Sequence, residues 1–109
     1  MSGSSITYVL HNSFGKKDYV PAHSHTCYEL VFYENAPVVV KYNSVHQAAK
    51  ETFDFDASFE KPIKINLQPN SFILVSPNVA HDELHVDSNS VMCIGFTYNG
   101  EEDLDQFSF

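Results

Sequence analysis

Short runs of hydrophobic and aromatic residues alternate with turn-forming residues along most of the chain. The pattern predicts strands at 6–14, 19–34, 36–42, 53–59, 61–67, 72–75 and 91–98. Turn signals containing proline or asparagine, at 34–37, 69–70 and 77–78, separate several of these runs. Many short strands with turns about every 8–12 residues are typical of a β-sandwich or a barrel.

Helix signals are almost absent. The one candidate is the segment Ser44–Phe53, which has good helix formers from Gln47 to Glu51 and is equally compatible with a long hairpin loop. We therefore expect one all-β domain over 1–109, with its core at about 6–98. The acidic tail at 99–109 ends in two exposed-looking phenylalanines, so we expect it to dock on the body or to begin a linker truncated from a longer protein.

The net charge of the chain argues against nucleic-acid binding. The 109 residues carry a formal net charge of −8, and all six basic residues are lysines. Because nucleic-acid binding depends on cationic side chains at phosphates, this chain is not expected to bind DNA or RNA directly. No apolar run approaches the roughly 20 residues of a membrane helix, and the N-terminus lacks a signal-peptide pattern. We expect a soluble, cytoplasmic protein without a membrane partner.

The stretch "PAHSHTCYEL" places four chemically active residues at every second position: His23, His25, Cys27 and Glu29. Side chains alternate faces along a strand, so these four are expected on one side. Imidazoles and a carboxylate are suitable ligands for Zn, Ni, Fe or Mn ions. Cys27 is interpreted as a thiol in the wall of a ligand pocket.

A second cluster follows about fifty residues later. His81, Glu83 and His85 share a parity, and His81 comes directly after a Pro-Asn turn, as the first residue of a new strand would. If that strand lies beside the first, His81 completes a metal site of three histidines and Glu29. Glu83 and His85 are then candidate ligand-binding residues together with Tyr33, although a solvated strand edge would give the same pattern.

These two segments resemble the paired motifs of the cupin superfamily. Residues 23–29 have the pattern HxH, three residues, Glu, and residues 69–81 resemble the second motif with its final histidine. The turn glycines of that pattern are replaced by Ala36, Asn70 and Asn78, and asparagine tolerates the left-handed backbone conformation. The resemblance implies a cupin-type double-stranded β-helix, which is a jelly-roll barrel, with the four predicted metal ligands inside it.

Within the cupins, "HSHTCYELVFY", "NSFILVSPNVAHDE" and "VMCIGF" are similar to the N-terminal sensing domain of AraC-type transcription regulators. This resemblance implies a small-molecule effector, a homodimer, and DNA binding by a separate C-terminal domain. The absence of arginine argues against a phosphate or carboxylate effector and favours a neutral or cationic one, such as a sugar. The alternatives are a metal-dependent cupin enzyme (a dioxygenase or an isomerase) and a non-catalytic metal-binding cupin. Outward-facing Tyr28, Leu30 and Phe32 supply the apolar surface expected of a dimer.

Overall fold

The computed structural model describes residues 4–46, 53–55 and 57–98. These residues form nine strands and no helix. The strands are β1 (Ser4–Phe14), β2 (Tyr19–His25), β3 (Tyr28–Tyr33), β4 (Val38–Asn43), β5 (Phe53–Asp54), β6 (Pro62–Leu67), β7 (Ser71–Val75), β8 (His81–His85) and β9 (Asn89–Tyr98).

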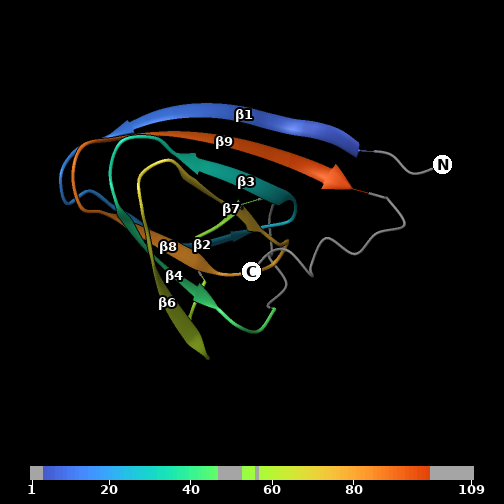
Figure 1. The fold of residues 1–109 in the computed structure, drawn as a ribbon. Coiled ribbons are helices and arrows are strands. Elements are labelled where there is room, and N and C mark those ends of the chain that lie inside the picture. The colour runs from blue at the N-terminus through green and yellow to red at the C-terminus, as the bar shows by residue number, and fades with distance from the viewer. Residues whose placement is uncertain (1–3, 47–52, 56, 99–109) are drawn as a thin grey trace.

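The strands form two antiparallel sheets, an arrangement compatible with a β-sandwich (Figure 1). One sheet has the order β1-β9-β3-β7, and the other has the order β5-β2-β8-β4-β6. The prediction of an all-β protein is confirmed. Across the described part of the chain, no helix is long and apolar enough to span a bilayer.

The predicted single strand at 19–34 is wrong in one respect, because the chain breaks at Thr26 and Cys27 and changes sheet. Strand β2 ends at His25 and pairs with β8, whereas β3 begins at Tyr28 and pairs with β9 and β7. His25 and Glu29 therefore lie in different sheets, yet both point into the space between them. Apolar and aromatic residues lie on both sides of the break, and the period-2 pattern of His23, His25, Cys27 and Glu29 continues across it, so the sequence pattern indicated one strand.

Most other predicted strands are confirmed with shifts of one or two residues at their ends. The predicted strand 53–59 is the exception, since Phe53 and Asp54 are the only described residues of this range that form a strand. The candidate helix falls mainly on 47–52 and the acidic tail on 99–109, both outside the described residues.

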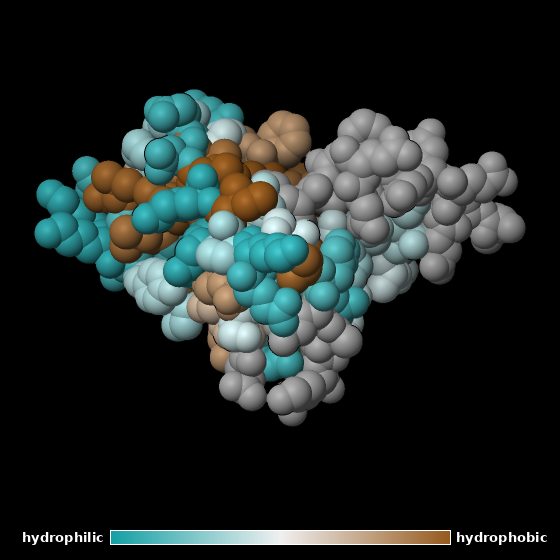
Figure 2. All heavy atoms as spheres, turned by 90° about the horizontal axis from the view of Figure 1, so that it is seen from below, coloured by the Kyte–Doolittle hydropathy of each residue, from teal (hydrophilic) through white to brown (hydrophobic). Residues whose placement is uncertain are grey.

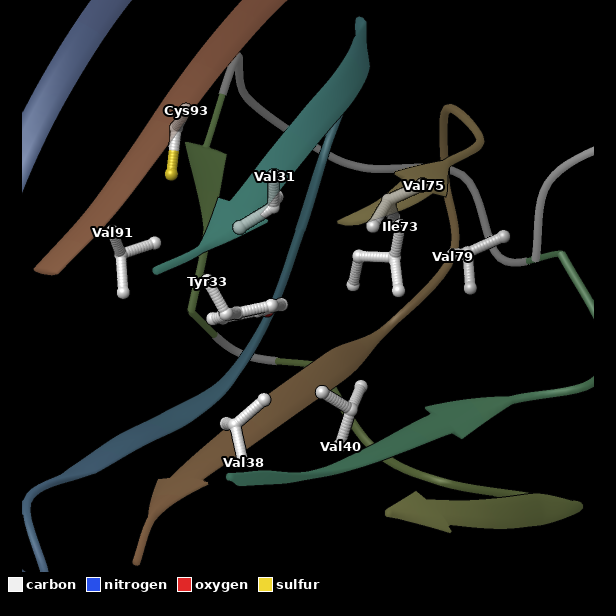
Figure 3. Packing of buried hydrophobic residues seen from close by; sticks show 9 residues of the cluster. All are labelled: Val31, Tyr33, Val38, Val40, Ile73, Val75, Val79, Val91 and Cys93. Atoms are coloured by element: carbon white, nitrogen blue, oxygen red, sulfur yellow. The ribbon is translucent and has the colours of Figure 1, made fainter. Parts of the chain in front are cut away.

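The hydrophobic core lies between the two sheets (Figure 3). Val31 of β3 and Val75 of β7 point from one sheet toward Val38 and Val40 of β4 in the other, and all four side chains are almost fully buried. Strand β3 shows the expected alternation, because Glu29, Val31 and Tyr33 are buried while Tyr28, Leu30 and Phe32 are half-buried. The outward face predicted for these last three residues is thus observed.

Two asparagines close the turns that precede β7 and β8. Asn70 has φ 62° and Asn78 has φ 65°, the left-handed conformation predicted for them from the sequence. The Asn78 N–H donates a hydrogen bond of 2.8 Å to the carbonyl of His25, and the Asn43 N–H donates one of 2.8 Å to that of Ala80. These bonds fix the turn before β8 against the ends of β2 and β4, so the turn positions the candidate site.

Candidate metal centre

Three histidines meet where β2 and β8 run side by side. His23 and His25 come from β2, and His81 is the first residue of β8, paired directly with His23. Each of the three offers a ring nitrogen within 4.8 Å of the other two, and each side chain is buried. The predicted meeting of His81 with the first motif is observed, and the three histidines are arranged so that they can bind a metal ion.

The three rings are oriented by the backbone close to them in sequence. Nδ1 of His23 lies 2.8 Å from the carbonyl oxygen of Pro21, Nδ1 of His25 lies 2.8 Å from that of Cys27, and Nδ1 of His81 lies 2.9 Å from that of Val79. A carbonyl only accepts, so each Nδ1 carries the proton and each neutral ring has its lone pair on Nε2.

The Nε2 atoms of His25 and His81 are buried, and no described residue gives them a hydrogen-bond partner. Buried polar atoms without partners are rare in folded proteins, and a metal ion is one group that satisfies them. A metal-bound histidine usually donates a hydrogen bond from its other ring N–H to a carbonyl or carboxylate, and all three histidines make such a bond here. The donor set therefore fits a divalent transition metal.

The electrostatics also favour neutral ligands. Burial, and after it the neighbouring His23 and His25, lower the pKa of His81 to about 3. Burial likewise lowers the pKa of His23, against an opposing effect of its hydrogen bond to Pro21. Both rings are thus uncharged at neutral pH, the state in which imidazole binds a metal.

Glu29 approaches the histidines from the opposite sheet. Its Oε1 lies 3.6 Å from Nε2 of His25 and 3.9 Å from Nε2 of His81. Ligands about 2.05 Å from a tetrahedral zinc are about 3.3 Å apart, so a small contraction would bring Oε1 to a shared ion. Glu29 is nevertheless not in the close group of three, and its place as a fourth ligand stays a prediction.

Tyr8 of β1 holds the other carboxylate oxygen. Its hydroxyl donates a hydrogen bond to Oε2 of Glu29. Burial alone raises the pKa of Glu29, but the interactions with His25 and Tyr8 outweigh it and lower this pKa to about 2. Glu29 is therefore ionised. Tyr8 could not be predicted as part of the site from the sequence, because Glu29 lies on β3, a strand that does not pair with β1.

A cavity of about 200 Å³ opens beside the histidines. His23 and Glu29 line it near the triad, and Glu83 of β8 lines it as well. Most of the remaining wall is apolar and comes from both sheets: Leu10, Phe14, Val20, Phe53, Phe55 and Val91. The predicted ligand-binding residue Glu83 thus lies in the wall of the cavity next to the candidate metal centre.

Tyr33 stands behind Glu83 and not in the cavity wall. It is buried in the hydrophobic core and makes a side-chain hydrogen bond with Glu83. Burial raises the pKa of Glu83 to about 7, against the opposing hydrogen bond from Tyr33. The structure therefore gives Tyr33 a supporting position and not the direct contact with a cavity ligand that the sequence suggested.

The other two predicted ligand-binding residues also lie outside the cavity wall. Cys27 is buried with its Sγ 3.8 Å from the Tyr8 hydroxyl and 4.0 Å from Nδ1 of His25. Its parity had suggested a shared face, but the strand ends before Cys27, and only its carbonyl serves the site by orienting His25. His85 is fully buried, and its ring stacks on Phe14 with centroids 4.2 Å apart. It supports the cavity wall from behind.

No protein-family model matches the chain, and neither a curated protein nor a solved structure matches it.

Proposed function

We propose that this chain is a cupin-type sensing domain in which a divalent metal, held by His23, His25 and His81, forms one wall of a small-molecule pocket. The observation that carries the proposal is the arrangement of the three rings: each Nδ1 is hydrogen-bonded to a carbonyl, and each ring offers a nitrogen within 4.8 Å of the other two. When bound, the metal would supply a Lewis-acidic centre with open positions for an effector atom. Zinc, nickel, iron and manganese are the candidate ions.

The sensing role follows from the combination of this centre with the adjacent cavity. A ligand in the cavity would contact both sheets. If it binds one arrangement of the sheets more tightly than another, its binding would shift the protein toward that arrangement, including at an outer dimer surface. In an AraC-type regulator, that change would act on a separate DNA-binding domain. The net charge of −8 is consistent with a division of labour in which this chain does not contact nucleic acid itself.

Metal binding is tested first. Protein treated with EDTA is dialysed against each candidate ion, and bound metal is measured by elemental analysis together with the thermal midpoint. We expect uptake of a single ion per chain and stabilisation of about 2.7 kcal/mol at a free metal concentration 100 times the Kd. His81→Ala should abolish both effects. His11→Ala, at an exposed histidine bonded to Ser90, is the matched control and should retain them. Equal metal uptake by the two variants would reject the site.

Catalysis is the alternative that the same geometry supports. Three protein ligands leave open positions, and a metal at this triad would lie next to a cavity, as a metal-dependent dioxygenase or isomerase requires. Turnover of a substrate by the metal-loaded protein, lost in His81→Ala, would favour the enzyme. Effector binding without turnover would favour the sensor.

A further inference from the structure

In the metal-free protein, the ionisable side chains of the cavity wall that carry charge are all acidic. Two carboxylates, Glu29 and Glu83, line the cavity, and none of the described lining residues is a lysine. The whole chain contains no arginine. An anionic ligand would therefore meet only like charge from these side chains, whereas a cationic ligand would meet opposite charge.

The two carboxylates differ in what their oxygens contact. Oε2 of Glu29 accepts a hydrogen bond from Tyr8, and its Oε1 lies 3.6 Å from Nε2 of His25, at the candidate metal centre. Glu83 is 8% exposed, and its Oε2 is buried with no hydrogen-bond partner among the described residues. Burying a carboxylate oxygen without a hydrogen-bond donor costs free energy. A ligand that supplies a donor would therefore gain more binding free energy at Glu83 than at Glu29.

The size and the remaining surface of the cavity limit the ligand. A cavity of about 150 Å³ binds benzene, so a volume of about 200 Å³ accommodates a ligand of roughly eight non-hydrogen atoms. Phe14, Val20 and Val91 give this space an apolar wall, and Phe53 adds a ring on the β5 side. These side chains suit a compact hydrocarbon group and not a sugar with hydroxyls on every side.

We propose that the cavity binds a small organic amine, with its ammonium group donating to the carboxylate of Glu83 and its hydrocarbon part packed against the apolar wall. This assignment rests on the proposed function, because it names the class of effector for the same pocket. It changes the expectation of a sugar to that of a compact cation.

The test uses metal-free protein in EDTA, so that an amine cannot bind by coordinating a metal. Isotopically labelled protein is titrated by NMR at pH 8, where Glu83 is largely ionised, with cyclohexylamine, benzylamine and hexylamine, and then with the alcohol and the carboxylate of each skeleton. We expect at least one amine to bind at least about tenfold more tightly than its alcohol, since a charge-assisted hydrogen bond exceeds a neutral one by about 1.4 kcal/mol. The carboxylates should bind more weakly still.

Glu83→Gln keeps the size of the side chain and removes its charge, so the preference for amine over alcohol should disappear. Glu60→Gln, at an exposed glutamate outside the cavity wall, should leave that preference intact. The assignment is overturned if no amine binds, if the alcohol binds as tightly as the amine, or if Glu83→Gln retains the preference.

Zinc uptake by the wild-type protein, measured in parallel, separates this outcome from failure of the metal centre. Zinc uptake without any amine preference rejects the ligand assignment and leaves the metal centre standing. Amine binding that depends on Glu83, in a protein that takes up no metal, rejects the metal centre and keeps the ligand assignment.

Discussion

The pKa of Glu83 predicts an unusual dependence of stability on pH in the metal-free protein. Burial raises this pKa from 4.5 to about 7, so the native state holds its proton over a range in which the unfolded chain has lost it. The contribution of Glu83 to the free energy of unfolding is therefore fully present below pH 4.5 and is lost as the pH rises through 7. At about 1.36 kcal/mol per pH unit, the 2.5-unit difference corresponds to a loss of about 3 kcal/mol.

Glu83→Gln isolates this effect because glutamine has a similar volume and does not ionise. Other titrating groups contribute equally to both proteins, so the difference between their unfolding free energies reports on Glu83. We expect the variant to gain about 2.5 kcal/mol relative to wild type between pH 5 and pH 8. The curve should rise most steeply between about pH 5 and pH 7 and flatten above it.

The assay is urea unfolding in EDTA, with the free energy extrapolated at half-unit steps of pH. Glu60→Gln provides the baseline, because that glutamate is exposed. A difference curve for Glu83→Gln that stays flat, or that falls as the pH rises, would falsify the assignment of a buried, protonated carboxyl group at this position.

Three further substitutions test other parts of the site and its supports. Tyr8→Phe leaves one oxygen of Glu29 without its donor, and should reduce stability at pH 7 by about 1.5–3 kcal/mol in urea unfolding; no loss would mean that the bond contributes nothing. Asn70→Ala should cost about 1 kcal/mol in the same assay because φ is 62°, and Asn70→Gly should not. A Cβ on Gly95 would overlap the Tyr8 ring, so Gly95→Ala should lower the thermal midpoint far more than Gly15→Ala, whose Cβ meets ordinary contacts; equal shifts would contradict the packing.

The sequence predicted the three histidines correctly because their chemistry is local. Strand parity put His23 and His25 on one face, and the Pro-Asn turn put His81 at the start of a strand. The left-handed φ of Asn78 was also predictable, since few residues other than glycine adopt it readily. Each of these features depends on neighbours within a few positions along the chain.

The features that the sequence did not predict depend on which strands become neighbours. The break after His25 places Glu29 in the other sheet, and the period-2 pattern of histidines, cysteine and glutamate continues across it without a signal. Tyr8 reaches Glu29 from a strand that does not pair with β3, because β9 lies between them. Cys27 had the right parity for the cavity but sits at the break, where parity no longer applies.

The two carboxylates of the cavity acquire opposite character from their hydrogen-bond donors. Both are buried, so desolvation acts on each in the same direction. Glu29 accepts a hydrogen bond from Tyr8 and lies close to His25, and its pKa falls to about 2. Among the described residues, Glu83 interacts favourably with Tyr33 only, and its pKa rises to about 7. Paired acidic groups whose environments separate their pKa values commonly divide their roles. Here Glu29 supplies a permanent charge beside the histidines, while Glu83 has an oxygen for which no described residue supplies a hydrogen-bond donor. This division favours a pocket built for two occupants, a metal at one end and a hydrogen-bond-donating ligand at the other.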